Sequence, residues 1–316
     1  MVPGMLFKNE GFTEFASDCS DWLREDCVVE GDDGNSHVSL SVPRDVWFEF
    51  IESIGGGLHV ACSPVAVLGV SGSYSPELAY GSEPVPSSEC GLYSPNLPEF
   101  GSLWALREQY DDGAHYLLEV RDVCGCPAQR VLIPHSANDV FLEFVSTFQT
   151  APDERGTWFS PNNASAEHRR RTLSNRIPWL RQLNHKEVAA SRVLPIEFID
   201  ELLARSLERS LQVRTTIYNR AILQGAIWTP EMRSLATVPA GGQNANVIRY
   251  FGDGTGLELI QDCKASAWLW TGQCNCCGEE KWAIEVGGPN DELSFAVRSV
   301  GEKHETQWRS FLQELL

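Results

Sequence analysis

A repeated pattern constrains the fold of this chain more than any other feature of its sequence. Two sets of residues match in type and order, and the second lies 164 to 167 positions after the first. The first set is Ser102, Trp104, Glu119, Val120, Val131, Phe141, Phe144 and Phe148, and the second is Ser266, Trp268, Glu285, Val286, Val297, Trp308, Phe311 and Leu315. Chance would not hold the offset this steady across strand-like and helix-like segments. The pattern predicts that one structural module occurs twice.

The repeat predicts the domain plan. We expect a first copy at 1–150 and a second at 166–316, joined by a linker at 151–165 that is rich in turn-forming residues. In each copy helical patterns come first, then strand patterns, then one closing helix. The plan is an α+β fold of two similar halves, each a large, mostly antiparallel sheet with flanking helices. Ligands often bind in clefts between such halves.

Local patterns place the individual elements. Apolar spacing predicts helices at 5–27, 43–51, 137–148, 166–184, 196–210 and 305–315, and strands within 58–70, 104–133, 213–218, 222–228 and 246–300. Pro43 suits a helix start, and the glycines at 55–57 end that helix. We expect the matched tryptophans Trp104 and Trp268 to pack in the core of each half.

Composition excludes several classes of protein. The formal net charge of -18 argues against a nucleic-acid partner, which requires a basic surface. The apolar runs are too short to span a membrane. The chain starts without a signal-like segment, so we expect a cytoplasmic protein whose cysteines are mostly reduced thiols.

One segment carries a net positive charge, although the chain as a whole is negative. Residues 167–192 hold seven Lys or Arg and only two Glu, for a net charge of +5. Guanidinium groups suit carboxylates and phosphates, so this segment is a candidate anion-binding helix. The alternative is a solvated face that pairs with the acidic body. The segment also contains His168 and His185, for which a surface or capping role is the alternative to ligand binding.

A cysteine cluster is the other candidate site. Cys274, Cys276 and Cys277 fall in an expected turn between two strands, and thiolates bind zinc well. No second Cys-x-x-Cys pair follows, so ordinary reduced thiols are the alternative to a metal or redox site.

Three segments of the second copy follow the order and spacing of a known family: Lys264-Ala-Ser-Ala-Trp268, Trp282-Ala-Ile-Glu285-Val286 and the closing Gln307-Trp308-Arg309-Ser-Phe311-Leu. In these segments the second copy resembles the haem-utilisation (hemin-degrading factor, HemS/ChuX-like) family. Asn219-Arg220-Ala-Ile-Leu-Gln224 is similar to the family's Gly-Asn-Arg-Gly turn and the strand after it, although Tyr218 and Ala221 replace the glycines. The resemblance covers about residues 96–148 and 174–316.

The resemblance implies a cytoplasmic protein that binds haem, or a similar anionic small molecule, for transfer or breakdown. The candidate haem-binding residues are His168, Arg169, Arg176, Arg181 and His185. The family's own iron-ligand positions are not kept, because Ser174 and Pro98 stand there. The alternative is a non-catalytic relative that no longer binds haem and acts as an interaction module. Whether the chain is an enzyme, and its oligomeric state, are left open.

Overall fold

The computed structural model of the chain describes residues 36–72, 92–95, 100–110, 113–123, 125, 127–150, 185–219, 221–240, 243–261, 265–274, 280–287, 293–300 and 302–316. The predicted helices at 5–27 and 166–184 lie outside these ranges. No described helix is long and apolar enough to cross a membrane.

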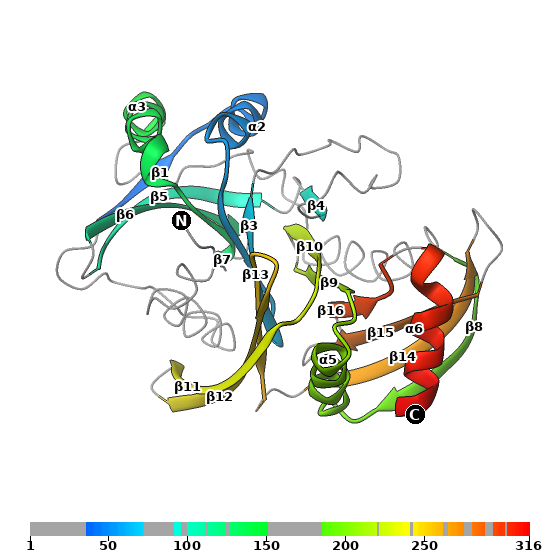
Figure 1. Cartoon of the computed structure of the whole chain (residues 1–316). Helices are drawn as coiled ribbons and strands as arrows, with labels where there is room; N and C mark the ends of the chain where they lie inside the picture. Colours follow the sequence, from blue (N-terminus) through cyan, green and yellow to red (C-terminus); the bar gives the residue numbers. More distant parts are fainter. Residues whose placement is uncertain are drawn as a thin grey trace.

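Two antiparallel sheets form most of the described structure (Figure 1). Sheet A has nine strands, in the order β1 (Ser36–Leu40), β5 (Phe100–Tyr110), β6 (Gly113–Asp122), β7 (Pro127–Leu132), β2 (Gly57–Cys62), β3 (Ala66–Gly72), β13 (Thr255–Ile260), β12 (Gln243–Gly252) and β11 (Met232–Ala240). Sheet B has seven, in the order β8 (His185–Leu194), β14 (Ser266–Cys274), β15 (Glu280–Gly287), β16 (Leu293–Arg298), β9 (Val213–Tyr218), β10 (Ile222–Trp228) and β4 (Leu92–Pro95). The predicted α+β class is therefore confirmed.

The two sheets run through their strands in the same order. In sheet A the order β1-β5-β6-β7-β2-β3 comes from the first half of the chain, and β8-β14-β15-β16-β9-β10 in sheet B comes from the second. Each sheet then takes its next strand from the other half. Strand β13 pairs with β3, and β4 pairs with β10. Each half of the chain thus helps to complete the sheet of the other.

Within the described residues, four α-helices flank the sheets: α2 (Arg44–Ser53) and α3 (Asn138–Phe148) beside sheet A, α5 (Phe198–Glu208) and α6 (Glu302–Leu315) beside sheet B (Figure 1). In α2 the buried residues Trp47, Phe50 and Ile51 recur at helical spacing, so one stripe faces the sheet. The chain then turns at Gly55, whose φ of 67° is strained for other residues.

The predicted elements agree with the structure with a few exceptions. Strands β9 and β10 begin and end as predicted, and the expected helices at 43–51, 137–148, 196–210 and 305–315 are α2, α3, α5 and α6. The strand pattern at 58–70 is two strands, β2 and β3. Four of the described strands, β1, β4, β8 and β11, lie outside the predicted strand ranges.

Each sheet has a core face and a polar face, because successive residues of a strand point to opposite sides. The core faces share one apolar cluster that includes Leu118 and Val131 of sheet A and Ile284 and Val297 of sheet B. The polar face of sheet A carries Trp104, Glu119 and Arg130, which lie opposite one another on β5, β6 and β7. On the polar face of sheet B, Trp268 lies opposite Glu285 and Glu285 lies opposite Ala296, while Arg298 is two residues further along β16.

The turn that resembles the haem-utilisation family joins the two sheets. The side-chain amide of Asn219 donates hydrogen bonds to the carbonyl oxygens of Cys62 (2.9 Å) and Ala128 (2.8 Å) in sheet A. Gln224 Nε2 donates to the carbonyl oxygens of His59 and Leu68, both at 2.9 Å. The β9–β10 hairpin is therefore anchored on strands β2, β3 and β7.

Candidate functional site

Most of the predicted haem-binding residues lie outside the described part of the chain. These are His168, Arg169, Arg176 and Arg181, and the two family ligand positions, Ser174 and Pro98, lie outside it as well. His185 is the first residue of β8, the edge strand of sheet B. The basic segment therefore leads directly into sheet B.

The cysteine cluster is described only at its first member. Cys274 ends β14 and lies opposite His185 in the register of β14 and β8. Cys276 and Cys277 lie outside the described residues. Within the described ranges, no group of three or more His, Cys, Asp or Glu side chains could hold a metal ion. The metal site at Cys274 stays a prediction.

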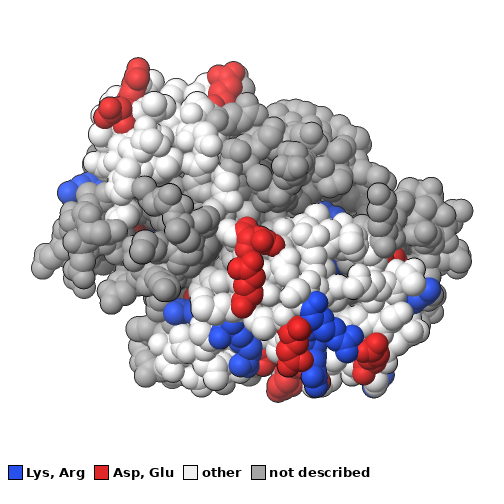
Figure 2. Space-filling view, viewed as in Figure 1, with Lys and Arg blue, Asp and Glu red and all other residues white. Residues whose placement is uncertain are grey.

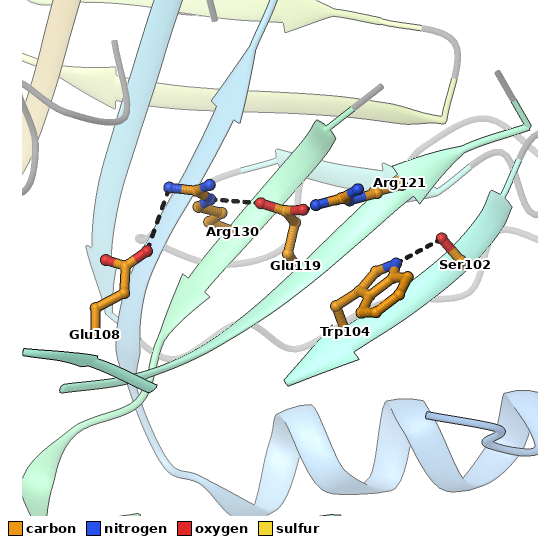
Figure 3. A network of polar contacts seen from close by, with 6 residues as sticks. All are labelled: Ser102, Trp104, Glu108, Glu119, Arg121 and Arg130. Carbon is orange, nitrogen blue, oxygen red and sulfur yellow. Dashed lines mark hydrogen bonds and ion pairs between the residues drawn. The ribbon is translucent and has the colours of Figure 1, made fainter. Parts of the chain in front are cut away.

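The polar face of sheet A carries a buried network of charges (Figure 3). Glu119 is fully buried and accepts hydrogen bonds from Arg121 Nε at 2.5 Å and Arg130 Nε at 2.7 Å. Arg130 Nη1 also lies 3.7 Å from Glu108 Oε1. Burial alone would raise the pKa of Glu119, but the two arginines hold that pKa below its ordinary value. Two carboxylates and two guanidinium groups balance, so this network has no excess charge.

Trp104 belongs to this network, and its predicted place in the core is wrong. Its indole Nε1 donates to Ser102 Oγ at 2.9 Å, and the Arg121 guanidinium lies 5.2 Å from the ring centroid (Figure 3). The neighbours Leu103 and Ala105 point to the core instead. Period-two alternation decides the face, and a tryptophan amid Ser102, Glu119 and Arg121 takes the polar side.

The polar face of sheet B holds a second cluster, which sequence reasoning missed. Arg298 Nη2 lies 3.5 Å from Glu285 Oε1 and donates to the Tyr218 hydroxyl at 3.3 Å. Its guanidinium lies over the ring of Trp270, 5.7 Å from the centroid. Arg214 on β9 is the direct cross-strand neighbour of Arg298. The signal available in the sequence was an arginine inside each of two apolar strand patterns, at a position where charge is unusual.

Four histidines whose side chains the structure describes, His59, His115, His135 and His304, lie away from this cluster. His59 is buried on the core face opposite Val131, and burial lowers its pKa to about 3, so it is neutral. The rings of His115 and His135 lie 5.2 Å apart beside α3. His304 is exposed on α6.

Charges on the surface over α5 and α6 are paired. Figure 2 shows blue and red side chains side by side over these helices. Arg209 Nη2 lies 2.5 Å from Glu314 Oε2, and Arg205 Nη1 lies 2.9 Å from Glu208 Oε2. Arg233 holds Asp200 through two hydrogen bonds, of 2.9 and 2.7 Å, and so ties α5 to β11.

Comparison with known proteins identifies the fold. No protein-family model and no curated protein sequence matches the chain. Among solved structures, ChuS, a heme oxygenase from E. coli, superposes with a TM-score of 0.66 at 13% identity, over 89% of each chain. Holo-PhuS, a heme-binding protein from Pseudomonas aeruginosa, superposes with a TM-score of 0.64 at 13% identity, over 87% of this chain and 85% of that one. The resemblance to the haem-utilisation family therefore holds at the level of the fold.

Proposed function

We propose that the chain is a cytoplasmic haem-binding protein of haem utilisation. The observation that carries this proposal is the structural likeness to ChuS and PhuS, which spans nearly the whole of each chain. Fold alone does not determine function. The second support is chemical: haem carries two carboxylates, and both the basic segment at 167–192, which runs into β8, and the arginines of sheet B suit carboxylates.

We also infer that the two halves, 1–150 and 166–316, are copies of one module joined by a linker at 151–165. The support is the shared strand order of the two sheets. The β2–β3 and β9–β10 turns are also alike: the side-chain oxygens of Ser63 and Asn219 each accept bonds from the backbone amides two and three residues later. Such a duplication supplies two polar faces, and on the described part of the one in sheet B two arginines, Arg214 and Arg298, accompany one buried carboxylate, Glu285.

The residues that would hold haem follow from position and chemistry. Haem iron needs an axial ligand, for which a neutral imidazole is well suited. His168 and His185 are the candidates, since both belong to the basic segment that enters sheet B. The candidates for binding the carboxylates of haem are Arg169, Arg176 and Arg181.

A hemin titration tests the proposal. Purified chain is titrated with hemin while the Soret band is followed, and a saturable shift is expected. His168→Ala and His185→Ala identify the axial ligand, because loss of that imidazole changes the Soret and visible bands. His304→Ala, on exposed α6, is the matched control and keeps the wild-type spectrum. A titration without saturation refutes haem binding.

The alternative function is an interaction module without haem. Ser174 and Pro98, at the family's ligand positions, favour it. It predicts colourless protein after expression with haem and iron supplied. Elemental analysis of the same preparation tests the metal site at Cys274, Cys276 and Cys277, which requires bound zinc or another thiophilic metal.

A further inference from the structure

Two histidine rings lie close together where the chain passes from sheet A into α3. His115 belongs to β6, and His135 is the first residue of the short helix η4 (His135–Ala137), which leads directly into α3. Their ring centroids are 5.2 Å apart, with 48° between the ring planes. His135 is exposed and His115 is half-buried, so an ion from solvent can reach the pair. Neither imidazole is among the candidate haem ligands.

The surrounding backbone holds both histidines in place. The amide of Ile133, two residues before His135, donates a hydrogen bond of 2.9 Å to the carbonyl oxygen of Tyr116, the residue after His115. The Tyr116 ring packs against Phe141 of α3, with 5.3 Å between the centroids. The two imidazoles therefore come from elements that are already packed together. A ligand that binds both requires little further ordering of the chain.

The separation of the two rings equals that of two imidazoles on one tetrahedral metal ion. A Zn–N bond of about 2.05 Å and a ring radius of about 1.15 Å put each ring centroid about 3.2 Å from the metal. At the tetrahedral angle of about 109°, two such centroids are about 5.2 Å apart. At the angle of about 90° found in square-planar or octahedral sites, they would be about 4.5 Å apart. The 5.2 Å between the rings of His115 and His135 thus fits the tetrahedral geometry.

A carboxylate on the neighbouring strand suits a cation at this place. Glu108 lies opposite His115 in the register of β5 and β6, so the two side chains share one face of the sheet. Glu108 also lies 3.7 Å from Arg130 Nη1 (Figure 3). An imidazole that binds a metal through one nitrogen commonly donates its other N–H to such a carboxylate. Since no described group of three or more His, Cys, Asp or Glu could hold a metal ion, water completes the coordination.

We propose that His115 and His135 form a binding site for a divalent transition-metal ion that prefers imidazole and a tetrahedral geometry, with Zn²⁺ as its type. The two histidines supply two ligands, and water supplies the rest. Imidazole suits Zn²⁺, whereas Mg²⁺ prefers oxygen ligands. The bound ion joins β6 to η4 and so fastens the start of α3 to sheet A. This site is separate from the proposed haem function and from the predicted metal site at Cys274.

The test follows the chemical modification of one histidine while the other is changed. Diethyl pyrocarbonate acylates imidazole nitrogens, and mass spectrometry locates each modified residue, so metal bound elsewhere in the chain does not obscure the result. The full chain, free of haem, is treated without metal, with Zn²⁺ and with Mg²⁺. The main variants are His115→Gln and His135→Gln. His304→Gln, on exposed α6, is the matched control, and the Tm of each variant without metal shows that it is folded.

Zn²⁺ is expected to slow modification of His135 about tenfold or more in wild type and to have little effect on it in His115→Gln, because a single imidazole lacks the gain from simultaneous binding. Protection of His115 is lost in the same way in His135→Gln, which keeps the test valid if only one variant folds. Mg²⁺ protects neither histidine, and His304→Gln behaves as wild type does.

Two results would overturn the site. One is modification of His135 in wild type at an unchanged rate in about 1 mM free Zn²⁺. The other is equal protection of His135 in wild type and in His115→Gln. Either result means that the two rings are in contact without sharing a metal ion.

Discussion

Glu119 offers the sharpest test of how sheet A is held together. Glu119→Gln keeps the shape of the side chain but removes its charge, which leaves Arg121 and Arg130 on a buried face without their carboxylate. Breaking a buried ion pair at one partner costs about 3–5 kcal/mol. In domains of 150–250 residues each kcal/mol lowers the Tm by about 2–4 °C, so the expected fall is on the order of 10 °C.

The assay is denaturant and thermal unfolding of wild type and Glu119→Gln, with Glu208→Gln as the matched control. Glu208 belongs to an exposed pair with Arg205, and its loss costs about 0.5 kcal/mol or less. Arg130→Ala copies the second half, where Ala296 holds that position. In the Arg130→Ala variant, Glu119→Gln lowers the free energy of unfolding by less than in wild type, because one of the two buried guanidinium groups that would lose its carboxylate has already been removed. Equal costs for Glu119→Gln and Glu208→Gln would refute the reasoning.

The same carboxylate predicts a pH dependence. The pKa of Glu119 is lower in the folded chain than the ordinary value of about 4.3 in the unfolded chain. The unfolded state therefore binds more protons as the solution becomes acidic, and stability falls with pH below about 5. Stability of Glu119→Gln falls less steeply over that range, and parallel curves for the two proteins contradict this assignment.

Three further predictions concern single positions. Burial raises the pKa of Glu258 to about 7 despite its hydrogen bond with Arg249, so between about pH 5 and 7 the folded chain binds a proton that the unfolded chain does not. As the pH rises from 5 to 8, wild type therefore loses stability relative to Glu258→Gln. A difference in stability that stays constant over this range contradicts the prediction. Asn219→Ala costs about 2 kcal/mol in urea unfolding, because two carbonyl oxygens of sheet A lose their donor, and Asn219→Asp, which keeps the turn but not the donor, costs nearly as much. Gly252→Ala lowers the Tm, because a Cβ at 252 would lie 1.9 Å from the Thr229 carbonyl oxygen; an unchanged Tm would show that the backbone moves apart.

The sequence was sufficient for the class of fold and for most elements, since those depend on local periodicity. Strands β9 and β10 have clear boundaries because Asn219 and Ala221 mark the turn between them. Strand β11 was missed because the side chains that the structure describes at 232–237 are mostly exposed, and its sequence shows no alternation of apolar and polar types. Its backbone partner β12, rather than burial, defines it as a strand.

The exchange of strands between the halves could not be predicted. Pairing of β3 with β13 joins Leu68 to Leu257, and nothing in either strand's own pattern selects that partner over another apolar strand. Only part of the candidate site could be predicted from the sequence, for the same reason. Arg214 and Arg298 lie 84 positions apart in the sequence, and only the register of β9 and β16 brings them together.

A crystal structure of the chain loaded with hemin is the most direct test of the account. The account predicts haem on the polar face of sheet B, with a carboxylate about 2.7–2.9 Å from the guanidinium nitrogens of Arg214 or Arg298. It predicts an imidazole from the basic segment on the iron. The account would be contradicted by haem bound on the polar face of sheet A, where the charges balance, or by a structure without bound haem at saturating hemin.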